Sequence, residues 1–179
     1  MINHKNHIAK GAPGYKLLLL LGLIIVLFYF SLPDQLFNDP ASTVVFDRNG
    51  KLLGARIADD GQWRFPMSDS LPHKFEICII SFEDRYFYNH PGVNPISLFR
   101  ALKQNIKAGK IVSGGSTISM QTVRLSRKGK PRSVFQKTVE MWLALRLEVS
   151  LSKNDILKLY ASHAPFGGNV VGLDAAAWR

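Results

Sequence analysis

An apolar run near the N-terminus constrains the fold of this chain more than any other feature. Residues 17–32 are sixteen residues without a charge, and their side chains are apolar almost throughout. The hydrocarbon core of a bilayer takes about 20 apolar residues as a helix, so Tyr15, Lys16 and Pro33 would lie at its interfaces. We therefore expect one transmembrane helix over residues 17–33, which serves as an uncleaved signal anchor.

A cleaved signal peptide or a buried core helix could also produce such a run. No Ala-x-Ala cleavage site follows it, and its apolar residues surround the helix axis instead of forming a stripe. Lys5, Lys10 and Lys16 precede the run, whereas acids follow it. The positive-inside rule then predicts a cytoplasmic tail at residues 1–16, with everything after residue 33 outside.

The positive charge of the chain is concentrated in one stretch. Residues 85–139 contain eleven Lys and Arg and no Asp or Glu, and the whole chain has a formal net charge of +10. Glu83, Asp84 and Glu140 lie at the edges of this stretch. A basic groove bounded by carboxylates suits a substrate that carries phosphates and must lose a proton. Nucleic acid is the usual partner of so basic a chain, but we exclude it because the stretch is expected outside the cytoplasmic membrane.

Beyond the apolar run, the pattern predicts a polar linker, a β-hairpin and a mainly helical domain. Strand-like runs at 43–46 and 51–57 are joined by Asn49-Gly50, a favourable hairpin turn. Capping signals predict helices over about 72–85 and 94–109, and after Ser116, Ser133 and Ser152. We assign residues 34–62 to the linker and hairpin, and residues 63–179 to the helical domain.

Glu83 is a candidate acid or base. It lies late in an apolar helical run, whose side chains should desolvate the carboxylate, as general acid–base chemistry requires. The alternative is a helix-end carboxylate that pairs with Arg85. In the same run lies Cys78, the single cysteine, which can form neither an internal disulfide nor a metal cluster. We expect this thiol to be buried by packing.

A second candidate group lies on the helix that follows the Gly114-Gly115-Ser116 turn. Thr117, Gln121 and Arg124 are spaced i, i+4 and i+7, so they share one face of that helix. Together with the free N–H groups of a helix N-terminus they make a candidate anion site. The alternative is a polar helix face that meets water.

Two further features are accounted for by ordinary contacts. Lys137 and Glu140 are one helical turn apart and can form a surface ion pair. His90 has no second His at metal-binding spacing, so we expect it to make a structural hydrogen bond.

Taken in order along the chain, these motifs form a specific pattern. It consists of Glu83-Asp84-Arg85-x-Phe87-x-x-His90-x-Gly92, then Gly114-Gly115-Ser116-Thr117-Ile118-Ser119-Met120-Gln121, then Lys137-x-x-Glu140, then Ile156-Leu157-x-x-Tyr160 and Pro165-Phe166-Gly167-Gly168. The pattern closely resembles the peptidoglycan glycosyltransferase domain (glycosyltransferase family 51) of bifunctional class A penicillin-binding proteins. The resemblance covers roughly residues 43–179, and an upstream membrane anchor is also typical of that family.

The resemblance implies a lysozyme-like, mainly α fold and an enzyme of cell-wall biosynthesis that polymerises lipid II into glycan strands. Glu83 would deprotonate the 4-hydroxyl of the acceptor sugar, which attacks the anomeric carbon of the donor, inverts it and expels undecaprenyl pyrophosphate. Glu140 would help to position the pyrophosphate, through neighbouring cations or a divalent cation such as Mg²⁺ or Mn²⁺, and no other cofactor is implied. The residues implied to bind or support substrate are Asp84, Phe87, His90, Ser116, Thr117, Gln121, Arg124 and Lys137.

The resemblance also implies partners and a location. The partners are lipid II, the growing glycan strand, membrane lipid and other proteins of cell-wall synthesis. The location is the inner membrane, with the N-terminus in the cytoplasm and the catalytic domain in the periplasm. Three positions depart from the usual family residues: Gln136 replaces Arg, Arg124 replaces Lys, and Ser162 replaces Asn.

Domains of this family continue past the position of Arg179, and a transpeptidase domain follows them. No Ser-x-x-Lys followed by Ser-x-Asn and Lys-Thr-Gly occurs in this sequence. We therefore expect an N-terminal fragment whose glycosyltransferase domain is incomplete at its C-terminus. Two other functions stay open: a lysozyme-like glycan-cleaving enzyme, which would also use a lone glutamate, and an inactive truncated scaffold anchored in the membrane.

Overall fold

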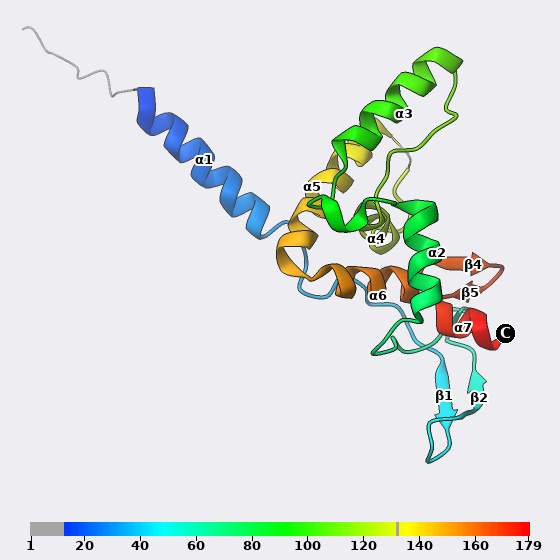
Figure 1. Ribbon diagram of the computed structural model, residues 1–179. Coiled ribbons are helices and arrows are strands. Elements are labelled where there is room, and N and C mark those ends of the chain that lie inside the picture. Colours follow the sequence, from blue (N-terminus) through cyan, green and yellow to red (C-terminus); the bar gives the residue numbers. More distant parts are fainter. Residues whose placement is uncertain (1–12, 132) are drawn as a thin grey trace, which may run out of the picture.

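The computed structural model describes residues 13–131 and 133–179, and it is mainly helical (Figure 1). The α-helices are α1 (Pro13–Tyr29), α2 (His73–Glu83), α3 (Pro95–Ala108), α4 (Ile118–Ser126), α5 (Val134–Ser150), α6 (Lys153–His163) and α7 (Leu173–Trp178), with one 3-10 turn, η1 (Phe87–Asn89). The strands are β1 (Thr43–Phe46), β2 (Leu52–Arg56), β3 (Trp63–Arg64), β4 (Pro165–Gly167) and β5 (Val170–Val171). The predicted fold class, mainly α with a small hairpin, is confirmed.

The hydrophobic core lies where α4, α5 and α6 meet. Phe87 from the η1 turn is fully buried and packs into this core, and Tyr160 is buried within it. Its other members are Ile118, Val123, Leu143, Leu147, Ile156, Leu157 and Ala164. Because Phe87 lies four residues after Glu83, core packing determines where the chain runs just after that glutamate.

The helices begin where the capping residues predict. The side chain of Asn94 accepts a hydrogen bond from the backbone N–H of Ser97 at 3.1 Å, and Pro95 occupies the first helical position of α3. Ser133 and Ser152 cap α5 and α6 in the same way. The predicted helix starts are confirmed.

The predicted hairpin is confirmed, and a second, smaller sheet accompanies it. β1 pairs with β2 in antiparallel register, and Gly50 in their turn has a φ of +78°. The second sheet has the order β3-β5-β4, with β3 parallel to β5. It holds the segment around Trp63 against the C-terminal segment, where Trp178 packs on Trp63 at 5.3 Å between ring centroids.

The transmembrane helix expected over residues 17–33 is not found in that form. α1 ends at Tyr29, where the Ser31 hydroxyl donates to the Phe28 carbonyl at 2.8 Å and Pro33 cannot continue a helix. Within residues 13–131 and 133–179, no helix is long and apolar enough to cross a membrane. The predicted tail at residues 1–16 lies mostly outside the described residues.

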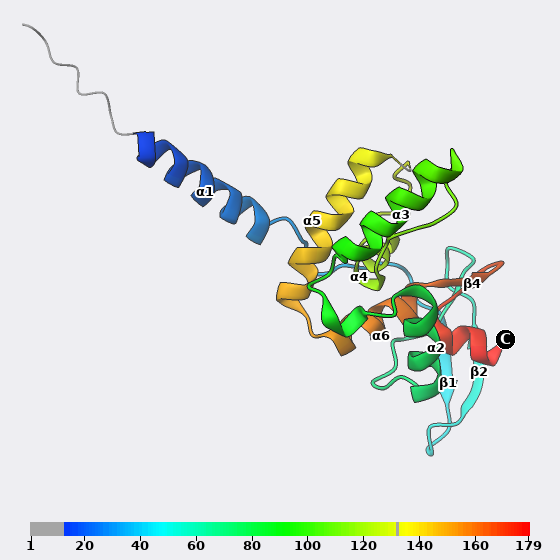
Figure 2. The same ribbon diagram turned by 45° about the horizontal axis from the view of Figure 1, so that its top comes forward.

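The apolar side chains of α1 are exposed, and the helix projects away from the body of the molecule (Figures 1 and 2). Its C-terminal end contacts α5, where Phe28 meets Trp142 edge to face at 5.1 Å between ring centroids. The linker that follows lies against the domain, because Phe37 stacks on His163 with ring centroids 3.6 Å apart.

The prediction that Cys78 is buried is wrong. Cys78 is exposed, none of the residues of α2 is buried, and Phe82 is 87% exposed. The reason is the position of α2 on the outside of the body, where only its residues Ile79 and Ile80 pack against the core, and these only in part. The apolar run of α2 therefore gives Glu83 less cover than the sequence predicts.

Candidate active site

Glu83 is the last residue of α2, and its carboxylate reaches the neighbouring helix α4. Gln121 Nε2 donates to Glu83 Oε2 at 2.7 Å, and the Glu83 side chain is half-buried. Arg85, the alternative partner, is exposed. The carboxylate is thus held by an amide, which leaves its other oxygen, Oε1, available to accept a proton.

Asp84 is buried and supports the site from behind. Its carboxylate lies 3.0 Å from His90 Nε2 and accepts the backbone N–H of Ile118, also at 3.0 Å. Ile118 opens α4, so the negative charge lies at the positive end of that helix. His90 Nδ1 accepts the backbone N–H of Gly92 at 3.2 Å, so the Nε2 N–H donates to Asp84. The predicted structural hydrogen bond of His90 is confirmed.

Thr117 is almost fully buried at the start of α4. Its hydroxyl donates to the Gly92 carbonyl at 2.5 Å and accepts the backbone N–H of Met120 at 3.2 Å. These contacts place Thr117 as the N-cap of α4 and join that helix to the segment after His90. Donor binding by Thr117 stays a prediction.

Two cationic side chains accompany α4. Lys137 Nζ donates to Ser116 Oγ at 2.8 Å, just before the first turn of the helix. Arg124 is half-buried and lies one turn after Gln121 on the same helix. The predicted anion-binding residues Ser116, Gln121, Arg124 and Lys137 therefore cluster at α4.

The charges of Glu83 and Arg124 both act on the phenol of Tyr160, which lies on α6. Burial raises the pKa of the Tyr160 phenol to about 12; the negative charge of Glu83 acts in the same direction, and the positive charge of Arg124 opposes both. Tyr160 belongs to one of the sequence motifs, but spacing along the chain does not reveal that the charges of Glu83 and Arg124 act on its phenol.

Glu140 is half-buried on α5, one turn after Lys137. Within residues 13–131 and 133–179, no hydrogen bond or ion pair to Glu140 is formed. The same residues hold no group of three His, Cys, Asp or Glu that could bind a metal ion. The expected role of Glu140 stays a prediction.

Comparison with known proteins agrees with this geometry. The model of the transglycosylase family matches residues 49–179. The chain belongs to this family, glycosyltransferase family 51 of the class A penicillin-binding proteins. It is 45% identical to penicillin-binding protein 1C of Escherichia coli (strain K12) over 143 residues, which are 78% of this chain and 18% of the relative. It is 33% identical to penicillin-binding protein 1A of Aquifex aeolicus (strain VF5) over 174 residues, which are 93% of this chain and 24% of the relative.

This transglycosylase chain spans less than a quarter of the length of these curated relatives. Met120 before Gln121, and the run at 164–168, predict the branch of penicillin-binding protein 1C. The 45% identity to the Escherichia coli protein agrees with that prediction.

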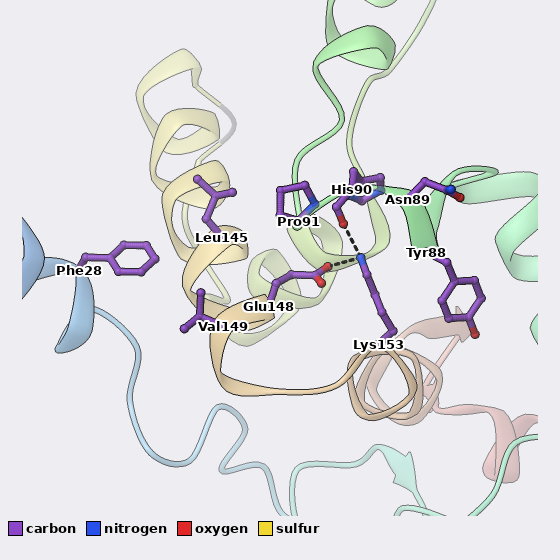
Figure 3. Close-up of a pocket in the computed structure, with 9 residues that line it drawn as sticks. All are labelled: Phe28, Tyr88, Asn89, His90, Pro91, Leu145, Glu148, Val149 and Lys153. Carbon is purple, nitrogen blue, oxygen red and sulfur yellow. Dashed lines mark hydrogen bonds and ion pairs between the residues drawn. The ribbon is translucent and has the colours of Figure 1, made fainter.

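Two residues near the transglycosylase site were not predicted from the sequence. Lys153 Nζ and Glu148 Oε1 are 2.8 Å apart, and both residues line a cavity of about 640 Å³ (Figure 3). The cavity is lined by Phe28, Tyr88, Asn89, His90, Pro91, Leu145, Glu148, Val149 and Lys153. Glu148 and Lys153 are five residues apart, and the end of α5 lies between them, before α6 begins at Lys153. Their spacing therefore matches no helix pattern that would predict an ion pair.

Proposed function

We propose that this chain carries the active site of a peptidoglycan glycosyltransferase that polymerises lipid II. The observation that carries the proposal is the Glu83 carboxylate, held at 2.7 Å by Gln121 on the helix that also carries Arg124. Membership of the transglycosylase family supports it. A lone carboxylate beside cations suits transfer of a sugar from a diphosphate donor.

In the proposed reaction Glu83 acts as the general base. Its carboxylate removes the proton of the acceptor's sugar 4-hydroxyl, and the oxygen forms a bond to the anomeric carbon of the donor with inversion. The bond from that carbon to the diphosphate oxygen breaks, and undecaprenyl pyrophosphate leaves with the electron pair. Proton transfer of this kind contributes roughly 10²- to 10⁴-fold in rate.

Arg124 and Lys137 would stabilise the charge that develops on the departing diphosphate. Lys137 lies beside Ser116 at the N-terminus of α4, where backbone N–H groups also favour an anion. Preorganised cations and N–H groups of this kind are usually the largest catalytic contribution. Glu140 would orient these cations or bind a divalent ion together with the substrate phosphates.

The lipid tail of such a donor requires contact with a membrane, and α3 offers a suitable face. The apolar side chains of Ile96, Phe99, Leu102 and Ile106 are all more than half exposed. Arg100, Lys103 and Lys107 are on the same helix. An exposed apolar face rimmed by cations favours the surface of an anionic bilayer. The proposed location is the periplasmic surface of the inner membrane.

The direct test is incubation of the chain with lipid II, followed by separation of the glycan products by length. We expect strands that lengthen with time and a stoichiometric release of undecaprenyl pyrophosphate. Shortening of pre-made glycan strands would instead establish a glycan-cleaving enzyme. Unchanged lipid II and unchanged glycan would establish an inactive scaffold.

A further inference from the structure

Lys153 makes three contacts that take no part in the proposed reaction. Its ammonium donates to the His90 carbonyl at 2.7 Å and to Glu148 Oε1 at 2.8 Å (Figure 3). It also lies 4.4 Å from the centroid of the Phe87 ring. An ammonium has three N–H donors, so these contacts use its full capacity. Two of the three partners belong to the loop that follows Glu83.

Glu148 extends these contacts to α4. Its Oε1 also accepts the hydroxyl of Ser119. Ser119 follows Ile118, whose backbone N–H donates to Asp84 at 3.0 Å. Asp84 accepts a hydrogen bond from the His90 ring. The backbone carbonyl of His90 in turn accepts a hydrogen bond from the Lys153 ammonium. The contacts form a closed ring that joins the loop after Glu83 to α4, α5 and α6.

The ring contains two carboxylates in little contact with water. The side chains of Asp84 and Glu148 are 4% and 8% exposed. His90 Nδ1 accepts the Gly92 N–H, so Nε2 is the ring nitrogen that contacts Asp84. The Lys153 cation therefore offsets the buried negative charge of Glu148.

Close backbone packing holds the same loop against α5. A Cβ on Gly92 would lie 2.6 Å from the Ala144 carbonyl oxygen and 2.9 Å from Glu148 Cγ. The loop thus has no room to move toward α5, and a change in the position of Glu148 would reach it directly.

We propose that Lys153 and Glu148 are positioning residues for the Glu83 carboxylate. Asp84 is the covalent neighbour of Glu83, so a shift of the loop would move Glu83 relative to Gln121 and Arg124 of α4. A displacement of about 1 Å at a reacting group can cost on the order of 100-fold in rate. The inference rests on the proposed glycosyltransferase function.

The test compares Lys153→Met with Lys158→Met, which changes another lysine of α6. Two quantities are measured: the kinetics of lipid II polymerisation, and hydrogen exchange of peptides that cover residues 84–92. For Lys153→Met we expect kcat to fall about 10- to 100-fold, with KM changed less than about twofold. Exchange of the 84–92 peptides should rise at least about tenfold, while that of α5 peptides stays at the wild-type rate. Lys158→Met should match the wild type in both measurements.

A double variant, Lys153→Met with Glu148→Met, separates positioning from stability alone. Removing both charges leaves no buried charge of the pair without its partner, so the melting temperature should recover relative to Lys153→Met. The positioning role predicts that kcat stays low and that the 84–92 peptides still exchange fast. Recovery of kcat together with the melting temperature would overturn the inference, as would unchanged exchange in Lys153→Met.

The two proposals fail in different ways. If the wild-type chain makes no glycan from lipid II, the proposed function fails. The exchange rates of residues 84–92 still test whether the ring of contacts holds the loop. Fast exchange in Lys153→Met but not in Lys158→Met supports this role, and slow exchange in Lys153→Met overturns it.

Discussion

Asp84 shows at the scale of one residue how the site is held. Its carboxylate accepts hydrogen bonds from His90 Nε2 and from the backbone N–H of Ile118, both at 3.0 Å, and the side chain is buried. We predict that Asp84→Asn lowers the free energy of unfolding by about 1–3 kcal/mol, because an amide places a donor where an acceptor is needed. Urea unfolding checks this, with Asp69→Asn at an exposed position as the control. Equal stability of the two variants would contradict the assignment.

His163 gives a prediction for pH. Burial lowers the pKa of His163 below its ordinary value, and the positive charges of Arg64 and Lys128 act in the same direction. The unfolded chain, with a histidine pKa of about 6.5, therefore binds more protons than the folded chain in acid. We expect stability to be present above about pH 6.5 and to be lost as the pH falls through the lowered pKa.

The measurement is the melting temperature at about pH 7.5 and about pH 5.0, on either side of the ordinary histidine pKa. His163→Gln should show a smaller loss between these two values than the wild type. His73→Gln, which changes an exposed histidine, is the control. An identical loss in all three proteins would show that His163 does not titrate as stated.

At the scale of elements, the sequence predicted the helix starts, because these depend on contacts between residues close together in the chain. Asn94, Ser133 and Ser152 identified helix starts, because a cap is a contact between residues three apart. The sheet of β3, β5 and β4 was not predictable, since strands of two or three residues carry no alternation and pair across about a hundred residues. The exposure of Cys78 escaped prediction for a similar reason, because an apolar run does not tell which face finds cover.

Gly92 marks where one element packs on another. Its φ is +98°, and a Cβ at this position would lie 2.6 Å from the Ala144 carbonyl oxygen, so there is no space for a side chain. Gly109 also has a positive φ, +64°, but open space around it. Gly92→Ala should therefore cost about 1–3 kcal/mol more in unfolding free energy than Gly109→Ala. Chemical denaturation of both variants checks this, and equal losses would contradict close packing of the loop on α5.

At the scale of the whole molecule, the residues around Glu83 divide into a group that the sequence predicted and a group that it did not. Gln121 meets Glu83 directly, and Lys137 meets Ser116, so the order of motifs along the sequence correctly indicated a shared place in the fold. Lys153 and Glu148 act through tertiary contacts between α5, α6 and residues 84–92. Spacing along the sequence does not report such contacts, because the separations depend on how the helices pack.

The exposed face of α3 yields a prediction for the whole molecule on a membrane. A tryptophan in Phe99→Trp should be quenched by brominated lipid in anionic vesicles, beyond the quenching of the three natural tryptophans. Phe46→Trp is the control, since Phe46 is exposed on the β1–β2 hairpin, far from α3 in both views (Figures 1 and 2). Equal extra quenching at both positions would contradict α3 as the membrane-facing side.

The central claim is that the Glu83 carboxylate, held by Gln121 of α4, removes the acceptor's proton. The most direct measurement is the rate of lipid II polymerisation by Glu83→Gln, compared with Glu76→Gln on the same helix. We predict a loss of at least about 100-fold for Glu83→Gln and less than about twofold for Glu76→Gln. A Glu83→Gln protein that polymerises at the wild-type rate would contradict the claim.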